Sequence, residues 1–350
     1  MSPRRLLPLV GAMVALAACA SPSTPPVPPA TSPRVVDVPV DVPVAPAAVP
    51  DAGVADAGPS PDAAVVAAAP TGERVRMFRG RSEDEWLRQM SERPVVRTLE
   101  RFHSTLFVFH MDLGDGVEIS FQPERPGQET FWRREVTSYH LARLLGIDNR
   151  VPPTVGKRVP LSAFGRFARG VNLVVDRRGM VLGSASVWMP TLNRVHMHLP
   201  PARRVWSSWV NPSRPLPEGP LRERARQVSE VLVFDYLAAN YDRWNCCNIT
   251  ADEHDDLVFR DNDAGWFPDV INRQGDPNVV RRVPRYLYEA VQRVTPEVLR
   301  ESVSHDPMAS SVHLVASRAY TGYELRRQAL LANLRRQVER HGEAAVFPWP

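Results

Sequence analysis

The stretch NYDRWNCCNITADEHDDLVFRDNDAGW, residues 240–266, places two carboxylates at the ends of secondary-structure elements. Apolar residues recur at helical spacing over 221–240, so a helix is expected there, and Asp242 lies on the loop that follows it. Residues 257–259 (LVF) predict a short strand that ends just before Asp261. The sequence therefore predicts one acidic group after a helix and a second one after a strand.

Phosphoryl transfer uses two carboxylates placed in this way. One carboxylate orients the attacking hydroxyl and accepts its proton, and the other holds the divalent ion that bridges the nucleotide phosphates. We therefore assign Asp242 to the first task and Asp261 to the second. The alternative is a solvated acidic turn, which suits the acidic residues between them: Asp252, Glu253, Asp255 and Asp256.

A second alternative is a calcium-binding loop in DNDAGWFPD, with Asp261, Asp263 and Asp269 as oxygen ligands. An EF-hand loop has glycine at its sixth position and a bidentate glutamate at its twelfth. Counted from Asp261, Gly265 is fifth and Asn272 is twelfth. The spacing therefore argues against this class of site.

The N-terminal residues indicate export. Arg4 and Arg5 precede an apolar run over 6–18, which is too short to span a bilayer as a helix and is typical of a signal peptide. Residues 16–19 (LAAC) resemble the lipobox of bacterial lipoproteins, which implies cleavage before Cys19 and lipid on its thiol. We expect residues 1–18 to be a lipoprotein signal peptide and the protein to be anchored to the outer membrane, facing the periplasm or the cell surface. The alternative is an ordinary signal peptide with a chance cysteine.

Composition separates a tether from a folded part. Residues 19–70 contain 13 prolines and no aromatic residue, so this segment cannot bury enough surface to offset its chain entropy. Over the whole sequence, 43 Lys and Arg face 39 Asp and Glu, a formal net charge of +4. The basic residues are spread along the chain and are not interleaved with aromatic residues, which argues against a nucleic-acid binder. The only cysteines beyond Cys19 are Cys246 and Cys247, so the fold depends on its core and not on a disulfide framework.

The folded part reads as a mixed lobe followed by a helical lobe. A hairpin is predicted from strands over 104–111 and 117–123, and a helix over 130–145, with Thr130 as a possible N-cap and Gly146 past its end. Further expected elements are strands in VNLVVD (171–176) and GSASVWMP (183–190) and a helix over 324–342. The predicted class is α+β with two lobes: a small N-lobe over 71–190 and a mainly helical C-lobe over 191–350.

Three segments together resemble the secretory-pathway atypical kinases, the group that includes Four-jointed and the Golgi casein kinase. FDYLAANYDRWN (234–245) and LVFRDNDAGW (257–266) are similar to the catalytic and metal-binding segments of that group. REVTSYHLARLLGIDNRVPPTVG (134–156) is similar to its regulatory helix and the Arg-Val-Pro-Pro stretch that follows. The resemblance covers residues 107–266 and implies a two-lobed, protein-kinase-like fold.

The resemblance implies roles for individual residues. Asp242 corresponds to the catalytic aspartate, Asp261 to the metal-binding aspartate and Glu135 to the helix glutamate of the nucleotide site. The expected cofactor is Mg²⁺ or Mn²⁺, and ATP is the expected substrate nucleotide. The alternative for Glu135 is a surface ion pair with an arginine, which would contribute little to stability.

Two positions depart from the group's pattern. The strand lysine that contacts phosphate is replaced by Gln122, which lacks the positive charge. Arg125, Arg133, Arg134 or Lys157 could supply that charge from elsewhere. The second metal ligand, usually five residues past the catalytic aspartate, falls on Cys247, a poor ligand for a hard cation, and Asn245 and Asn248 are the neighbouring oxygen donors.

Two functions of different classes follow. The first is an exported kinase-like enzyme that transfers phosphate from a nucleotide to a hydroxyl of an unknown protein or glycan acceptor. The second is a catalytically inactive pseudokinase that binds a ligand or partner, which the glutamine at 122 favours.

Overall fold

A computed structural model describes residues 76–350 except 104–106, 245–247 and 267–276. The chain divides into two units between Ala69 and Pro70, and the description below concerns the second unit. The expected signal peptide, the tether and Cys19 lie outside the described residues, so these remain predictions. No helix among the described residues has the length and apolarity needed to cross a membrane.

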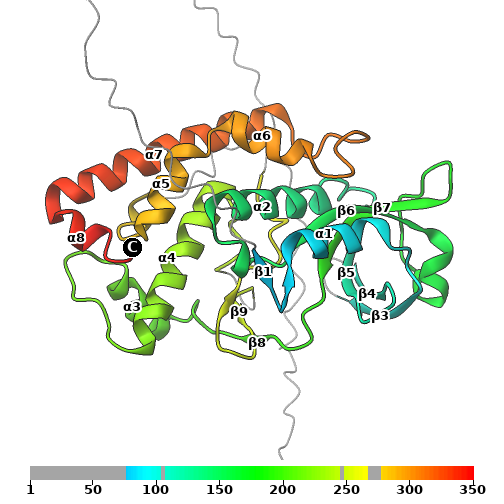
Figure 1. The fold of residues 1–350 in the computed structure, drawn as a ribbon, viewed down its shortest axis with the longest axis horizontal. Helices are drawn as coiled ribbons and strands as arrows, with labels where there is room; N and C mark the ends of the chain where they lie inside the picture. Colours follow the sequence, from blue (N-terminus) through cyan, green and yellow to red (C-terminus); the bar gives the residue numbers. More distant parts are fainter. Residues whose placement is uncertain (1–75, 104–106, 245–247, 267–276) are drawn as a thin grey trace, which may run out of the picture. The chain divides into compact units, whose positions relative to one another are not determined.

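One lobe is built on a five-stranded antiparallel sheet in the order β3-β4-β5-β7-β6 (Figure 1). Its strands are β3 (Arg97–His103), β4 (Phe107–Asp112), β5 (Glu118–Pro123), β6 (Thr154–Pro160) and β7 (Met180–Val187). Before the sheet come β1 (Met77–Phe78), β2 (Arg81–Ser82) and helix α1 (Glu83–Glu92), and 3-10 helix η2 (Leu161–Ala168) follows β6. Phe109, Ile119 and Phe121 lie in the core of this lobe, which is fully shielded from solvent at these residues.

The predicted hairpin is formed by β4 and β5, which pair with Phe109 opposite Phe121. Burial alternates along β5, with Ile119 and Phe121 buried and Ser120 and Gln122 half-buried. This alternation is what a strand with one face on the core requires. Gln122 therefore lies on the face opposite the apolar core of the sheet.

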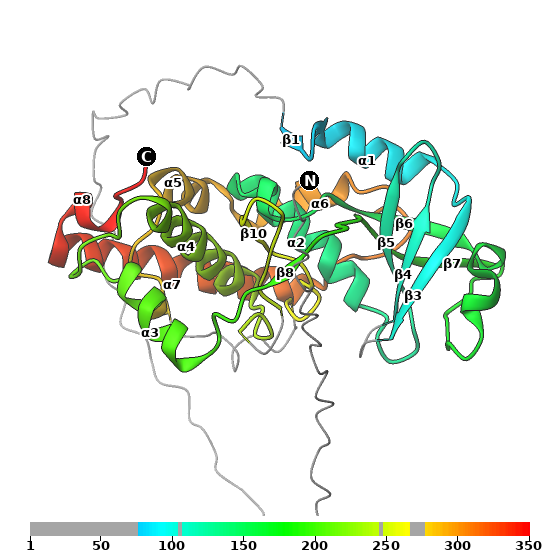
Figure 2. The ribbon, with the colours of Figure 1, turned by 90° about the horizontal axis from the view of Figure 1, so that it is seen from below.

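Helix α2 (Phe131–Leu145) connects the two lobes. It contacts β6 and β7 on one side and α4, α5 and α6 on the other (Figure 2). It ends, as predicted, at Gly146, whose left-handed conformation (φ 75°) lets its N–H bond to main-chain carbonyls of the last turn. Because both sides of α2 are covered, even Arg134 and Glu135 are buried.

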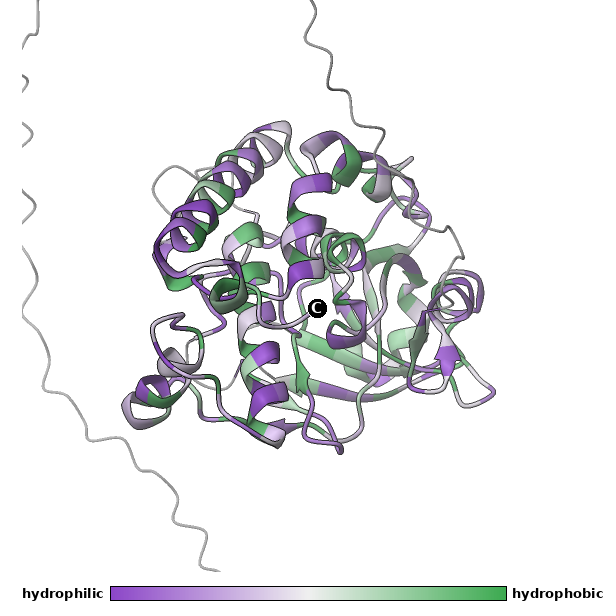
Figure 3. Ribbon diagram, turned by 60° about the vertical axis from the view of Figure 1, so that its left-hand side comes forward, coloured by the Kyte–Doolittle hydropathy of each residue, from purple (hydrophilic) through white to green (hydrophobic). Residues whose placement is uncertain are grey.

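The second lobe is mainly helical and has its own apolar core. Its helices are α3 (Pro200–Trp209), α4 (Pro220–Ala238), α5 (Arg285–Arg293), α6 (Pro296–Ser304), α7 (Ser317–His341) and α8 (Glu343–Val346). A small sheet in the order β10-β9-β8 is formed by β8 (Asn193–Arg194), β9 (Thr250–Ala251) and β10 (Leu257–Val258), and short 3-10 helices are η1 (Asp148–Arg150) and η4 (Pro277–Val279). Apolar stretches alternate with polar ones along these helices, as expected for helices with one buried face (Figure 3).

Most expected elements are present, and one is not. The hairpin and the helix at 130–145 are confirmed. The strand expected over 183–190 is present as β7, which ends at Val187, and the helix expected over 324–342 is the C-terminal part of α7, which begins at Ser317. The strand expected over 171–176 was wrong, because only Val175 forms an isolated bridge, to Val181. The α+β, two-lobed class is confirmed, whereas the lobe boundary at residue 190 remains a prediction.

Candidate phosphotransferase site

The chain leaves α4 through a strained turn that carries Asp242 onto a loop. Ala239 caps α4 in the left-handed region (φ 56°), and its N–H bonds to the carbonyls of Asp235 and Tyr236. The side chain of Asn240 then accepts a hydrogen bond of 3.1 Å from the Asp242 N–H. The helix end and this turn together determine the main-chain position of Asp242.

The segment after β10 docks on the same end of α4. Trp266 donates its main-chain N–H to the Ala238 carbonyl at 2.9 Å. A Cβ on Gly265 would lie 2.6 Å from that carbonyl oxygen, so only glycine permits this approach. Asp261 adopts a left-handed conformation (φ 54°), which aspartate tolerates better than most residues. The two acidic residues therefore lie on loops that share one anchoring point.

Arg243 ties the two loops together. Its guanidinium is almost fully buried and forms an ion pair with Asp235 on α4 at 3.2 Å. It also donates to the main-chain carbonyls of Asn248, at 3.3 Å, and Arg260, and to the side chain of Asn262. One cation thus links α4, the loop that carries Asp242 and the loop that carries Asp261.

Glu135 reaches this unit from α2. Its carboxylate accepts hydrogen bonds from the main-chain N–H of Asn262 at 2.5 Å and from its side-chain amide at 3.1 Å. Burial first, and then the negative charges of Asp263 and Asp261, raise the pKa of Glu135 to about 8. The surface ion pair considered as an alternative for Glu135 is therefore ruled out, because the side chain is buried and bonded to the loop of Asp261.

Gln122 reaches the same loop from β5. Its amide nitrogen donates to the carboxylate of Asp263 at 2.6 Å. Burial, with a smaller contribution from the charge of Asp261, raises the pKa of Asp263 to about 6, and the charge of Asp242 also acts to raise it. Asp242 and Asp261 therefore act electrostatically on Asp263, and Asp263 and Asp261 act on Glu135.

Oxygen donors for a divalent cation are present on both loops. Asp261 is about half exposed, and Asn248 lies beside Asp242, to which its amide nitrogen donates at 2.6 Å. Within the described parts of the chain, no three acidic, histidine or cysteine side chains are grouped to hold a metal ion. Asn245 and Cys247 lie outside the described residues, and the metal-binding roles remain predictions.

Four residues of this unit were not predicted as site residues: Arg243, Asn262, Asp263 and Gly265. The signal for Arg243 and Asn262 was present, since each directly follows a predicted carboxylate in the quoted motifs. Asp263 had been considered only as a calcium ligand. Its contact with Gln122 joins residues 141 positions apart, which no local pattern indicates.

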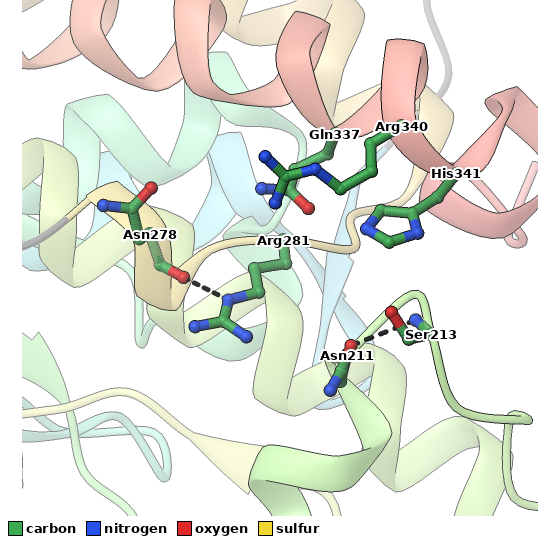
Figure 4. Close-up of a pocket in the computed structure, with 7 residues that line it drawn as sticks. All are labelled: Asn211, Ser213, Asn278, Arg281, Gln337, Arg340 and His341. Carbon is green, nitrogen blue, oxygen red and sulfur yellow. Dashed lines mark hydrogen bonds between the residues drawn. The ribbon is translucent and has the colours of Figure 1, made fainter.

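A polar pocket of about 560 Å³ lies elsewhere, between α7, η4 and the segment after α3 (Figure 4). Its lining includes the guanidinium groups of Arg281 and Arg340 and the ring of His341, and the Arg281 side chain donates to the Asn278 carbonyl at 2.6 Å. None of the residues predicted for phosphoryl transfer lines it. It is therefore separate from the candidate site.

A mixed lobe and a helical lobe, joined by a helix whose buried glutamate contacts the loop of a strand-end aspartate, define a kinase-like protein. Solved structures agree with this class. The crystal structure of the Golgi casein kinase aligns over 76% of this chain and 78% of that one, with a TM-score of 0.55 and 17% identity. The same kinase with Mn/ADP bound gives a TM-score of 0.53, and hydra Fam20 with sugar gives 0.51 over 75% of this chain and 90% of that one, at 15% identity.

Sequence comparison points to the same group. The chain is 30% identical to Four-jointed box protein 1 of Homo sapiens and 31% identical to that of Mus musculus, over 161 residues. This is 37% of the present chain, which spans about a third of the length of these relatives. No family model matches. The predicted resemblance to the secretory-pathway atypical kinases is confirmed, and the protein has a secretory-type kinase-like fold.

Proposed function

We propose that this protein is a metal-dependent phosphotransferase that moves the γ-phosphoryl group of a nucleotide to a hydroxyl of a protein or glycan. The observation that supports this most is the hydrogen-bonded unit centred on Arg243 and Asn262, which joins the loops of Asp242 and Asp261 to Glu135. Because phosphoryl transfer depends mainly on positioning and electrostatics, a pre-arranged unit of this kind is what the reaction requires.

Each group has a defined task in this proposal. Asp242 accepts the proton of the acceptor hydroxyl. At the same time the hydroxyl oxygen forms a bond to the γ-phosphorus, and the bond between the γ-phosphorus and the β-γ bridging oxygen breaks. Asn248 orients Asp242 by donating to its carboxylate and to its main-chain carbonyl, at 2.6 and 3.0 Å. Asp261 and Asn248 would hold Mg²⁺ or Mn²⁺, which supplies positive charge to the phosphates. Glu135 holds the loop of Asp261 through Asn262.

The comparisons suggest which reagents to test first. One structural neighbour was solved with Mn and ADP, another with sugar, and the first is named as a casein kinase. We would therefore measure Mn²⁺-dependent binding of ADP and ATP to the full-length chain, followed by transfer from labelled ATP to itself, to casein and to a sugar panel. Transfer that requires Mn²⁺ or Mg²⁺ supports the proposal, and nucleotide binding without any transfer contradicts it.

Three variants separate the tasks. Asp261→Ala is expected to abolish metal-dependent nucleotide binding with the fold intact, whereas Asp242→Ala should retain binding and lose transfer. The control is Glu253→Ala in the same stretch, because Glu253 is exposed and forms only a surface ion pair with Arg79. Wild-type activity in either aspartate variant would refute the role assigned to it.

The second candidate is a pseudokinase that binds a ligand or partner. It is favoured by one contact, because the amide of Gln122 is bonded to Asp263 where the related kinases are expected to carry a phosphate-contacting lysine. Metal-dependent nucleotide binding combined with an absence of transfer in every acceptor assay would support the pseudokinase function.

We also propose that the protein is exported and lipid-anchored at Cys19. The motif at residues 16–19 supports this. Metabolic labelling with an alkyne fatty acid in a bacterial host should modify the wild type and leave Cys19→Ser unlabelled, and equal labelling of both would contradict the anchor.

A further inference from the structure

The candidate site lacks the ion pair that usually supports phosphate binding in kinases. In protein kinases a strand lysine pairs with the helix glutamate and with the nucleotide. Here the strand position is Gln122, and the carboxylate of Glu135 accepts two hydrogen bonds from Asn262. A nucleotide bound here brings further negative charge to a site that already contains several carboxylates, so a cation from another position is required.

Three of the cations offered by the sequence are committed elsewhere. Lys157 donates to the carbonyls of Met90 and Arg93 at 2.7 Å each, at the C-terminal end of α1. Arg133 is bonded to Glu124 at 3.2 Å and to the His313 carbonyl at 3.3 Å.

Arg125 also points away from the loop of Asp261. It donates to Gln128 at 3.1 Å and lies over the ring of Phe107, 4.4 Å from the ring centre. None of these contacts includes a residue of the loop that carries Asp261 and Asp263.

Arg134 is different, because it contacts the residue that Gln122 contacts. Its guanidinium donates to the main-chain carbonyl of Asp263 at 3.3 Å, while Gln122 bonds to the carboxylate of the same residue. Arg134 directly precedes Glu135 on α2, and only 7% of its surface is exposed. The buried guanidinium of Arg134, which also lies over the ring of Phe131, therefore contacts the same residue as the side chain of the strand position 122.

We propose that Arg134 supplies, from the first turn of α2, the phosphate-binding positive charge that a lysine at position 122 would supply. This inference rests on the proposed function, since it assumes that a nucleoside di- or triphosphate binds in this site. Arginine suits the task because its planar guanidinium stays charged when buried and can contact two phosphate oxygens at once.

Arg260 is the competing cation. It is 40% exposed and lies 3.6 Å from the carboxylate of Asp261. Both residues of that pair are partly exposed, and Asp261 is the predicted metal ligand. Arg134 is instead buried and contacts Asp263, the residue that Gln122 also contacts. The two assignments are separated by comparing variants at both positions.

The test measures binding of ATP, ADP and adenosine to the full-length chain in Mn²⁺. Arg134→Met is expected to weaken ATP and ADP binding about 10- to 100-fold, the range for losing a hydrogen bond to a charged group, and to leave adenosine binding unchanged. Arg133→Met is the matched control, one position earlier on the same helix, and should change none of the three affinities.

Rescue variants exclude a purely structural effect. Arg134→Lys keeps the charge but loses the planar fork, so we expect a several-fold weakening confined to ATP and ADP, and this variant gives an answer even if Arg134→Met does not fold. Adding Gln122→Lys to Arg134→Met should restore most of the lost affinity for the phosphate-bearing ligands.

Four outcomes overturn the inference. These are unchanged ATP affinity in Arg134→Met, equal weakening of adenosine and ATP, no rescue by Gln122→Lys, or a phosphate-specific loss in Arg260→Met but not in Arg134→Met. Failure of the wild type to bind any nucleotide with Mn²⁺ would instead remove the proposed function, and this inference with it.

Discussion

Replacing Arg243 by methionine tests whether this arginine organises the site. The variant removes the partner of the buried carboxylate of Asp235 and leaves acceptors on Asn248, Arg260 and Asn262 without their donor. Removing one partner of a buried ion pair typically costs about 3–5 kcal/mol of unfolding free energy. We expect a loss of that size at about pH 7.5, measured by urea denaturation of the full-length chain.

The pH dependence of this loss follows from Asp235. Burial raises its pKa to about 6 even though the charge of Arg243 lowers it, so removing Arg243 moves the pKa further up. Because a raised carboxyl pKa gives stability that is present at low pH and lost as pH rises through the folded pKa, the variant keeps losing stability above pH 6 where the wild type has levelled off. At about 1.4 kcal/mol per pH unit, the loss is about 2 kcal/mol larger at about pH 7.5 than at about pH 5.

A second substitution isolates the buried charge. Asp235→Asn added to Arg243→Met removes the uncompensated carboxylate, which costs about 1.4 kcal/mol for each pH unit above its unfolded pKa, so the stability recovered should be about 3 kcal/mol larger at about pH 7.5 than at about pH 5. If the loss in Arg243→Met is the same at both pH values, or if the double variant is no more stable than Arg243→Met, the assigned role of the ion pair is wrong.

Three further predictions concern α2, the end of α4 and the loop docked on it. Burial, followed by neighbouring positive charges, lowers the pKa of His140 to about 4. Below about pH 6.5 the unfolded chain therefore binds a proton at this residue that the folded chain does not bind. The wild type should lose about 2 kcal/mol of unfolding free energy between about pH 7 and pH 5, and His140→Gln should not show this loss. Ala239→Gly should raise the melting temperature, since it relieves a left-handed alanine by about 0.5–1 kcal/mol, whereas Ala238→Gly, inside the helix, should lower it. Gly265→Ala should cost about 1–3 kcal/mol and weaken Mn²⁺-dependent nucleotide binding, because its Cβ would collide with a main-chain carbonyl; unchanged stability would contradict the close docking of this loop.

Local patterns predicted the elements that carry the site. The hairpin of β4 and β5 combines two-residue alternation with a turn at Asp115 and Gly116, both of which adopt positive φ. The expected strand over 171–176 failed for a reason outside that segment. β7 already pairs with β5 and β6 on its two sides. Residues 171–176 can therefore pair with β7 only where β5 has ended, which is at Val181.

The interior of the site was less predictable than its outline. The placement of Asp242 and Asp261 followed from a helix end and a strand end, and the charges of both act to raise the pKa of Asp263. The bonds between Gln122 and Asp263 and between Glu135 and Asn262 join residues separated by 141 and 127 positions. Such contacts depend on how α2 and β5 pack over the loops, and periodicity within one element carries no information about them.

The charges of the site imply that metal and nucleotide bind together. Burial and mutual repulsion raise the pKa of Glu135 to about 8 and of Asp263 to about 6, which shows that the cluster already opposes additional negative charge. A triphosphate would add several negative charges to it, and Arg134 can offset only one. In the proposed function a divalent ion held by Asp261 offsets much of the remainder, so we expect its binding and that of ATP to be strongly coupled. We expect removal of Mn²⁺ with a chelator to abolish measurable ATP binding. ATP should tighten Mn²⁺ binding by the same factor by which Mn²⁺ tightens ATP binding. Tight binding of ATP without metal would show that the phosphates lie outside this cluster.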